Sequence, residues 1–130
     1  MDKILVVDDD ARGLHNVATF LRQEEYEVDM AWNGNQAALL LDKVKVDLVL
    51  SDIMMPGLDG FGLLKHIRSI SPEIPVLLMS GFDVEVEEII ERAAVDFIIK
   101  PLDLDVLVFK IRRALDTNLL GKTRAIPQIP

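Results

Sequence analysis

Short apolar runs and amphipathic segments alternate along this chain. The runs are rich in aliphatic and β-branched residues, as is typical of strands, and they lie at residues 3–7, 27–31, 47–51, 75–79 and 95–99. Between them, apolar residues recur at the i, i+3, i+4 and i+7 spacing of a helix with one buried side. This alternation, repeated five times, predicts an α/β domain whose parallel sheet carries helices on both faces.

The apolar content of the runs predicts their places in the sheet. The runs at 47–51, 75–79 and 95–99 are almost continuously apolar, as expected of strands covered on both faces. The run at 27–31 is the most polar and is expected at an edge. The buried stripes of the five helices are expected to consist of Leu14, Val17, Ala18 and Leu21; Ala37, Leu40, Leu41 and Val44; Leu63, Leu64 and Ile67; Val86, Ile89, Ile90 and Ala93; and Leu104, Leu107, Val108, Ile111 and Leu115.

One domain of this kind accounts for most of the chain. The 130 residues are 50% hydrophobic, which is enough for one compact core. After Leu120, Gly121 predicts the end of the last helix, and Pro127 and Pro130 oppose its continuation. We therefore expect a domain over residues 1–120 and, at 121–130, a tail or the start of a linker to an output domain.

The composition excludes several classes of function. The chain has no cysteine, which rules out disulfides, thiolate zinc sites and cysteine nucleophiles. The formal net charge is −8 and the pI is near 4.6, so we expect this domain to bind neither nucleic acid nor anionic membranes. The sequence has no signal-like segment and no apolar stretch of about 18 residues. We therefore expect a cytoplasmic protein.

Four of the five predicted strands deliver polar residues to one edge of the sheet. Because ligands of open α/β sheets bind at the carboxyl ends of the strands, we expect these residues to meet there. In strand order they are Asp8, Asp9 and Asp10; Ser51 and Asp52; Ser80 and Gly81; and Lys100 and Pro101. Asp9 or Asp10 has an alternative role as the N-cap of the first helix, and Asp59 is expected to cap the third.

Clustered carboxylates favour a divalent cation. Two carboxylates about 4 Å apart repel by roughly 4 kcal/mol at an effective dielectric constant near 20. Mg²⁺ prefers oxygen ligands and keeps several waters, which suits a site of two or three carboxylates and an incoming phosphate. An aspartate can attack phosphorus and form an aspartyl phosphate. Lys100 and Ser80 would then stabilise the transferred group.

Four motifs in the chain resemble the response-regulator receiver family in order and spacing. They are VVDDD at 6–10, LVLSDIMMPGLDG at 48–60, PVLLMSG at 75–81 and DFIIKPLD at 96–103. The resemblance implies a doubly wound, flavodoxin-like (βα)5 fold with a five-stranded parallel sheet in the order 2-1-3-4-5. It also implies that Asp52 accepts a phosphoryl group.

The resemblance implies a metal site around the acceptor. Asp9, Asp52 and the backbone carbonyl of Met54 would bind Mg²⁺ directly, and Asp8 would bind it through a water. The apolar side chains of Met54 and Phe82 would flank the phosphoryl group and slow its hydrolysis, because neither side chain can orient an attacking water well.

Further roles follow from the resemblance. Ser80 and Lys100 would contact the phosphoryl oxygens, and the Lys100-Pro101 peptide would be cis. Ser80 and Phe97 occupy the two switch positions of the family, where threonine and tyrosine are commoner. A serine hydroxyl suffices for the chemistry, but Phe97 has no hydroxyl, so we expect any switching to rest on packing.

The function implied is a phosphorylation-activated signalling switch of a two-component system. A histidine kinase or histidine phosphotransfer protein would donate the phosphoryl group to this regulatory domain, which is not an enzyme but assists its own phosphotransfer and dephosphorylation. Phosphorylation would alter a homodimer or output-domain contact through the fourth helix, fifth strand and fifth helix, where Val106 and Phe109 lie off the buried stripe. Two alternatives are an aspartate-nucleophile phosphatase, which typically has a second Asp where this chain has Met54, and a degenerate receiver that binds partners without phosphorylation.

Overall fold

The computed structural model describes residues 1–81 and 96–123, with side chains described up to residue 116 in the second range. The helix predicted around residues 86–93 and the side chain of Phe82 lie outside these residues. None of the described helices is long and apolar enough to cross a membrane. The described elements are β1 (Lys3–Val7), α1 (Ala11–Gln23), β2 (Glu27–Ala31), α2 (Gly34–Leu41), β3 (Leu48–Asp52), α3 (Gly60–Ile70), β4 (Val76–Ser80), β5 (Asp96–Ile99) and α5 (Leu104–Thr123).

The five strands form one sheet in the order β2-β1-β3-β4-β5, and every pairing is parallel. This confirms the fold class, the strand order and the place of the polar strand β2 at an edge. The register places Val7 of β1 beside Ser51 of β3, so the carboxyl ends of the two central strands lie next to each other. The residues that follow β1 therefore meet the last residue of β3.

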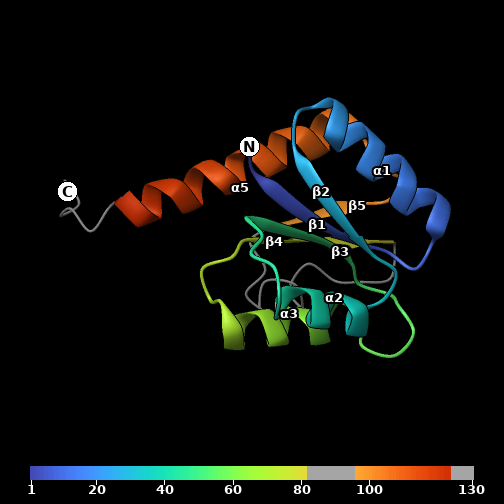
Figure 1. Ribbon diagram of the computed structural model, residues 1–130. Helices are drawn as coiled ribbons and strands as arrows, with labels where there is room; N and C mark the ends of the chain where they lie inside the picture. The colour runs from blue at the N-terminus through green and yellow to red at the C-terminus, as the bar shows by residue number, and fades with distance from the viewer. Residues whose placement is uncertain (82–95, 124–130) are drawn as a thin grey trace.

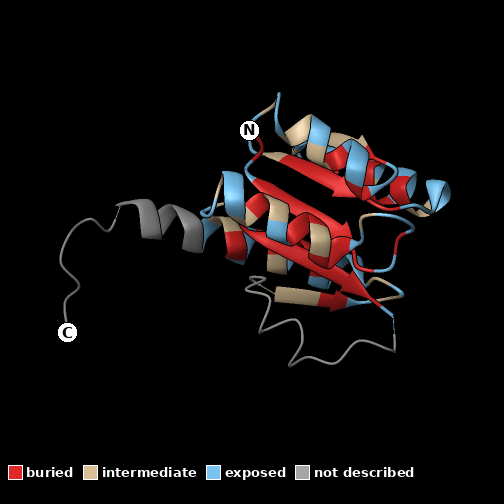
Figure 2. Cartoon of the chain, turned by 90° about the horizontal axis from the view of Figure 1, so that it is seen from below, coloured by how far each residue is buried: buried red, intermediate tan, exposed pale blue. Residues whose placement is uncertain are grey.

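Helices cover both faces of the sheet (Figure 1). Because side chains alternate between the faces of a strand, β1 contributes Ile4 and Val6 to the core beneath α1 and α5, and Leu5 and Val7 to the core beneath α2 and α3. The central strands are almost entirely buried, whereas β5 at the other edge is only partly covered by described residues (Figure 2). The strands that lead to the site are thus packed on both faces.

Polar side chains cap the N-termini of the first three helices. Asp10 accepts a hydrogen bond from the Arg12 N–H at 3.3 Å, and Asp59 accepts one from the Gly62 N–H at 2.8 Å. Asn33 plays the same part in α2. These bonds satisfy backbone N–H groups that have no partner inside the helix. The capping roles of Asp10 and Asp59 are confirmed, so Asp10 belongs to the helix rather than to the carboxylate cluster.

Three details of the helices differ from the sequence prediction. Leu104 is 40% exposed and Ala114 is buried instead, because α5 starts at the rim of the sheet and meets the core only from its second turn. Val44 follows the end of α2 but still packs against the core. The helix α5 runs through Gly121 to Thr123, so the predicted stop is wrong, since glycine in a helix costs only about 1 kcal/mol.

Candidate functional site

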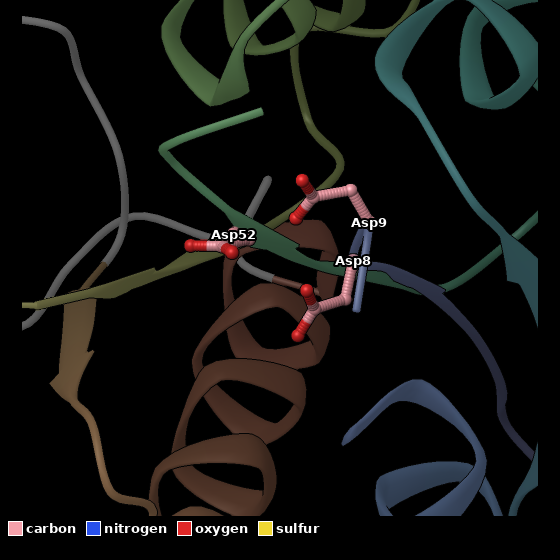
Figure 3. A group of neighbouring side chains, drawn as sticks. All are labelled: Asp8, Asp9 and Asp52. Carbon is pink, nitrogen blue, oxygen red and sulfur yellow. The ribbon is translucent and has the colours of Figure 1, made fainter. Parts of the chain in front are cut away.

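Three carboxylates lie together at the carboxyl edge of the sheet (Figure 3). Asp8 and Asp9 follow β1 directly, and Asp52 is the last residue of the neighbouring strand β3. Each offers one carboxylate oxygen, and these oxygens all lie within 4.8 Å of one another. The parallel pairing of β1 and β3 thus brings residues more than 40 positions apart into one cluster.

Lys100 places its ammonium group between two of these carboxylates. Its Nζ donates to Asp52 Oδ2 at 3.0 Å and to Asp8 Oδ2 at 3.1 Å. The backbone of Lys100 is held by a hydrogen bond from its N–H to the Ser80 carbonyl at 2.8 Å. The Lys100-Pro101 peptide is cis, as the resemblance implied. The end of β5 therefore presents one cation to the acidic cluster.

Burial perturbs the acidic side chain of Asp52. The residue is 7% exposed, and its burial raises its pKa above the ordinary value, despite the hydrogen bond and charge of Lys100, which lower it. The negative charge of Asp8 adds to the rise, while a backbone hydrogen bond from Met54 opposes it. We attribute the net direction to burial beside a second carboxylate.

The pKa of Lys100 lies above its ordinary value. Burial alone would lower this pKa, but the hydrogen bonds and charges of Asp52 and Asp8 outweigh that effect. The cluster holds three carboxylates and one ammonium group, which pairs with two of them, so it keeps an excess of two negative charges when all are ionised.

The donor set fits a hard divalent cation such as Mg²⁺. All three acidic residues offer oxygen, and the charge that Lys100 leaves uncompensated equals that of the ion. Asp9 is exposed, while Asp8 and Asp52 are buried, so the cluster is open to solvent on one side. Met54 lies two residues after Asp52, and its backbone acts to lower the pKa of the Asp52 carboxyl group. The carbonyl of Met54 as a metal ligand stays a prediction.

The two predicted switch residues lie on neighbouring strands. Ser80 is the last residue of β4, is 2% exposed and pairs with Ile99 of β5. Phe97 is half-buried and packs against the core beneath α2 and α3. The structure places Ser80 at the carboxyl edge with Lys100 and keeps Phe97 three residues before that edge. Their part in switching stays a prediction.

A second group of charged side chains lies beside Phe97 and was not predicted from the sequence. It consists of Asp96, Lys110 and Arg113. Lys110 donates to the Phe97 carbonyl at 2.7 Å and to Asp96 Oδ1 at 3.2 Å, and its Nζ lies 5.2 Å from the centre of the Phe97 ring. Arg113 bonds to Asp96 Oδ2 at 2.5 Å. Burial would raise the pKa of Asp96, but its hydrogen bonds from the Phe97 N–H, Arg113 and Lys110 hold it below the ordinary value. The signal in the sequence was the i, i+3 spacing of Lys110 and Arg113, which puts both on one helix face.

The apolar residues near the site divide between core and surface. Met55 is buried and fills the core, whereas Met54 is 67% exposed beside the acceptor.

A cavity of about 410 Å³ adjoins the cluster between α1 and the segment after β5. Asp8 and Lys100 line it together with Val17 and Leu104. The acidic cluster therefore opens toward a partly apolar hollow.

Comparisons with known proteins agree with this architecture. The family model described as the response regulator receiver domain matches residues 4–112. The transcriptional regulatory protein ZraR of Salmonella typhimurium is 40% identical over 114 residues, which cover 86% of this chain and 26% of ZraR. The chain thus spans about a quarter of the length of that relative.

Solved structures show the same fold. The crystal structure of NtrX from Brucella abortus in complex with ATP superimposes with a TM-score of 0.89 at 36% identity, covering 95% of this chain and 29% of the NtrX chain. The receiver domain of the Francisella response regulator 1452 superimposes with a TM-score of 0.82 at 28% identity, covering 90% of this chain and 98% of that domain. The similarity is therefore to a whole receiver domain and to one part of longer regulators.

Proposed function

Since this chain belongs to the response regulator receiver domain family, a family of phosphorylation-activated two-component switches, we propose that its phosphoryl acceptor is Asp52. The observation that carries this assignment is the place of Asp52 within the site. Among the described residues, it is the one carboxylate that ends a central strand, bonds to Lys100 and has an oxygen within 4.8 Å of oxygens of both Asp8 and Asp9.

The proposed transfer gives each of these side chains a role. A carboxylate oxygen of Asp52 forms a bond to phosphorus while the bond from phosphorus to the donor's imidazole nitrogen breaks, and the electron pair of that bond stays on nitrogen. Lys100 then neutralises a phosphoryl oxygen, and the Ser80 hydroxyl donates to another. Asp8, Asp9, Asp52 and the Met54 carbonyl would hold Mg²⁺, which supplies positive charge to the transferred group when bound.

The phosphoryl donor and the target of the signal are both proposed from the family. The donor is a histidine kinase or a histidine phosphotransfer protein. The response passes through the predicted fourth helix, β5 and α5 to a second copy or to an output domain. Exposed apolar side chains support this surface: Ile99 is 55% exposed, Val106 40% and Phe109 60%.

The limits of the domain are part of the proposal. We place the receiver at residues 1–120 and a tail or linker at 121–130, of which residues 121–123 continue α5. We further propose that this domain works in the cytoplasm, does not contact nucleic acid or membranes, and catalyses nothing beyond its own phosphotransfer and dephosphorylation.

Two other functions are less well supported. An aspartate-nucleophile phosphatase typically has a second acidic residue two positions after the nucleophile, where this chain has the apolar Met54. A degenerate receiver lacks part of the acidic or basic set, whereas this site has carboxylate oxygens of Asp8, Asp9 and Asp52 within 4.8 Å of one another and Lys100 paired with Asp8 and Asp52.

Phosphorylation of the purified chain tests the assignment. Incubation with acetyl phosphate and Mg²⁺ is expected to add one phosphate to the wild type and none to Asp52→Asn, as read by intact-protein mass spectrometry. Asp59→Asn is the matched control, because asparagine also caps helices well and the residue lies outside the cluster. Equal phosphate uptake by Asp52→Asn and Asp59→Asn would show that the acceptor lies elsewhere.

A further inference from the structure

The segment that links β3 to α3 packs against the beginning of α2. Gly34 is the first residue of α2 and is buried. A Cβ atom placed on Gly34 would overlap the carbonyl oxygen of Leu58 and would lie 2.9 Å from Leu58 Cβ and 3.0 Å from its carbonyl carbon. The side-chain nitrogen of Asn35 also lies close to Gly57 of the same segment. Any side chain at position 34 must therefore force the start of α2 and the backbone at Leu58 apart.

Space, rather than backbone conformation, accounts for a glycine at position 34. Gly57 is the one glycine in the described part of the chain with a positive φ, at 73°. Gly34 has an ordinary helical place, where alanine is favoured over glycine by up to about 1 kcal/mol. The local backbone conformation thus gives no reason for glycine rather than alanine at position 34. The close approach of Leu58 gives that reason, because it leaves no room for a side chain.

The segment that Gly34 contacts is closed upon itself beside the acceptor. The Gly60 N–H donates to the Ile53 carbonyl at 2.9 Å, which fixes the two ends of the segment to each other. Within it, the backbone of Met54 lies near enough to the Asp52 carboxylate to lower its pKa. Because both ends are fixed, a displacement at Leu58 has to be taken up by the residues in between.

We propose that Gly34 is a positioning residue for the metal and acceptor site. By letting the first turn of α2 lie directly against Leu58, it holds the segment 53–59 in the shape that keeps the Met54 amide on Asp52 and the Met54 carbonyl available to Mg²⁺. Gly34 touches neither the ion nor the phosphoryl group and acts through Met54. This inference rests on the function proposed above.

Two glycine-to-alanine variants separate this role from simple crowding. Gly34→Ala presses on the backbone of Leu58. Gly62→Ala is the matched control: its new methyl group meets the same residue, but it contacts Cδ1 at 2.5 Å, the flexible end of the Leu58 side chain, which can turn away. Both positions lie in the first turn of a helix.

The measurement is Mg²⁺ binding to the metal-free chain by calorimetry. Gly34→Ala is expected to weaken Mg²⁺ affinity by about tenfold, as found for residues that orient metal ligands, while Gly62→Ala binds as the wild type does. The rate of phosphorylation by acetyl phosphate is expected to fall in Gly34→Ala at low Mg²⁺ and to recover when Mg²⁺ is raised. In a variant that is already folded without Mg²⁺, a glycine needed only for folding would not produce that recovery.

Stability is measured in parallel by urea unfolding, so that binding is compared between folded proteins. If Gly34→Ala is partly unfolded, the titrations of all three proteins are repeated in trimethylamine N-oxide, which favours the folded state. Wild-type Mg²⁺ affinity in folded Gly34→Ala would overturn the inference, even with a lowered melting temperature. Failure of the wild type to bind Mg²⁺ and take up phosphate would instead overturn the proposed function, and that result is read without any variant.

Discussion

Removing the charge of Asp52 is expected to stabilise the metal-free fold at neutral pH. Asp52 is nearly buried, and burial raises its pKa. A carboxyl group whose pKa is higher in the folded state than the ordinary 3.8 holds its proton more tightly when folded. Its contribution to stability is therefore full below pH 3.8 and is lost as the pH rises through the folded pKa. At pH 7 the ionised Asp52 opposes folding.

The distances in the cluster give the size of the effect. At an effective dielectric constant of about 20, the attraction between Asp52 and Lys100 at 3.0 Å is about 5.5 kcal/mol. Repulsion from the buried Asp8, within 4.8 Å, is at least about 3.5 kcal/mol, and repulsion from the exposed Asp9, screened by water at a dielectric constant of about 80, is about 0.9 kcal/mol. The charges around Asp52 therefore come within about 1 kcal/mol of cancelling. The cost of burying the carboxylate, which is several kcal/mol for an ion, decides the direction, in agreement with burial as the main cause of its raised pKa.

Urea unfolding with a chelator measures this difference. Asp52→Asn is expected to be more stable than the wild type by about 1 kcal/mol or more at pH 7 and to lose that advantage toward pH 4. Saturating Mg²⁺ should narrow the gap, since at 100 times its dissociation constant a ligand of the folded state adds about 2.7 kcal/mol. Asp59→Asn serves again as control. An Asp52→Asn variant less stable than the wild type at pH 7 without Mg²⁺ would refute the reasoning.

Three further predictions concern the metal, the lifetime of the phosphate and the signalling surface. Asp9→Asn should weaken Mg²⁺ binding, measured by calorimetry, while Asp10→Asn, which keeps the helix cap, should not; equal affinities in both would move the metal elsewhere. Met54→Asn should hasten loss of phosphate by about tenfold after the donor is removed, since an orienting contact of about 1.4 kcal/mol corresponds to that factor; an unchanged or slower decay would argue against shielding by Met54. Phe109→Ala should abolish the change in sedimentation that the phosphate mimic beryllofluoride causes in the wild type, and an undiminished change would exclude this face.

Much of the fold could be predicted from the sequence because its signals are local. The stripe of Leu14, Val17, Ala18 and Leu21 is buried as expected, since helical periodicity depends only on near neighbours in the chain. The strands were placed to within one residue for the same reason. The strand order came from the family motifs and not from periodicity, which says nothing about which strands pair.

The acidic site was predictable by a rule of topology. In a parallel sheet all carboxyl ends lie at one edge, so Asp8, Asp52 and Lys100 had to come near one another once the strands were recognised. The rule does not say which atoms meet. That Lys100 bonds to both carboxylates at once, and that Asp10 leaves the cluster to cap α1, depend on the exact ends of the strands.

Only the tertiary structure decided how the layers approach each other. The overlap that keeps position 34 a glycine involves Leu58, 24 residues further along the chain, and no local pattern marks that contact. The contacts of Lys110 with the carbonyl and ring of Phe97, and the exposure of Leu104, likewise depend on where α5 crosses the sheet. Periodicity records which side of an element is apolar, whereas the distance between two elements is set by the packing of all the side chains between them.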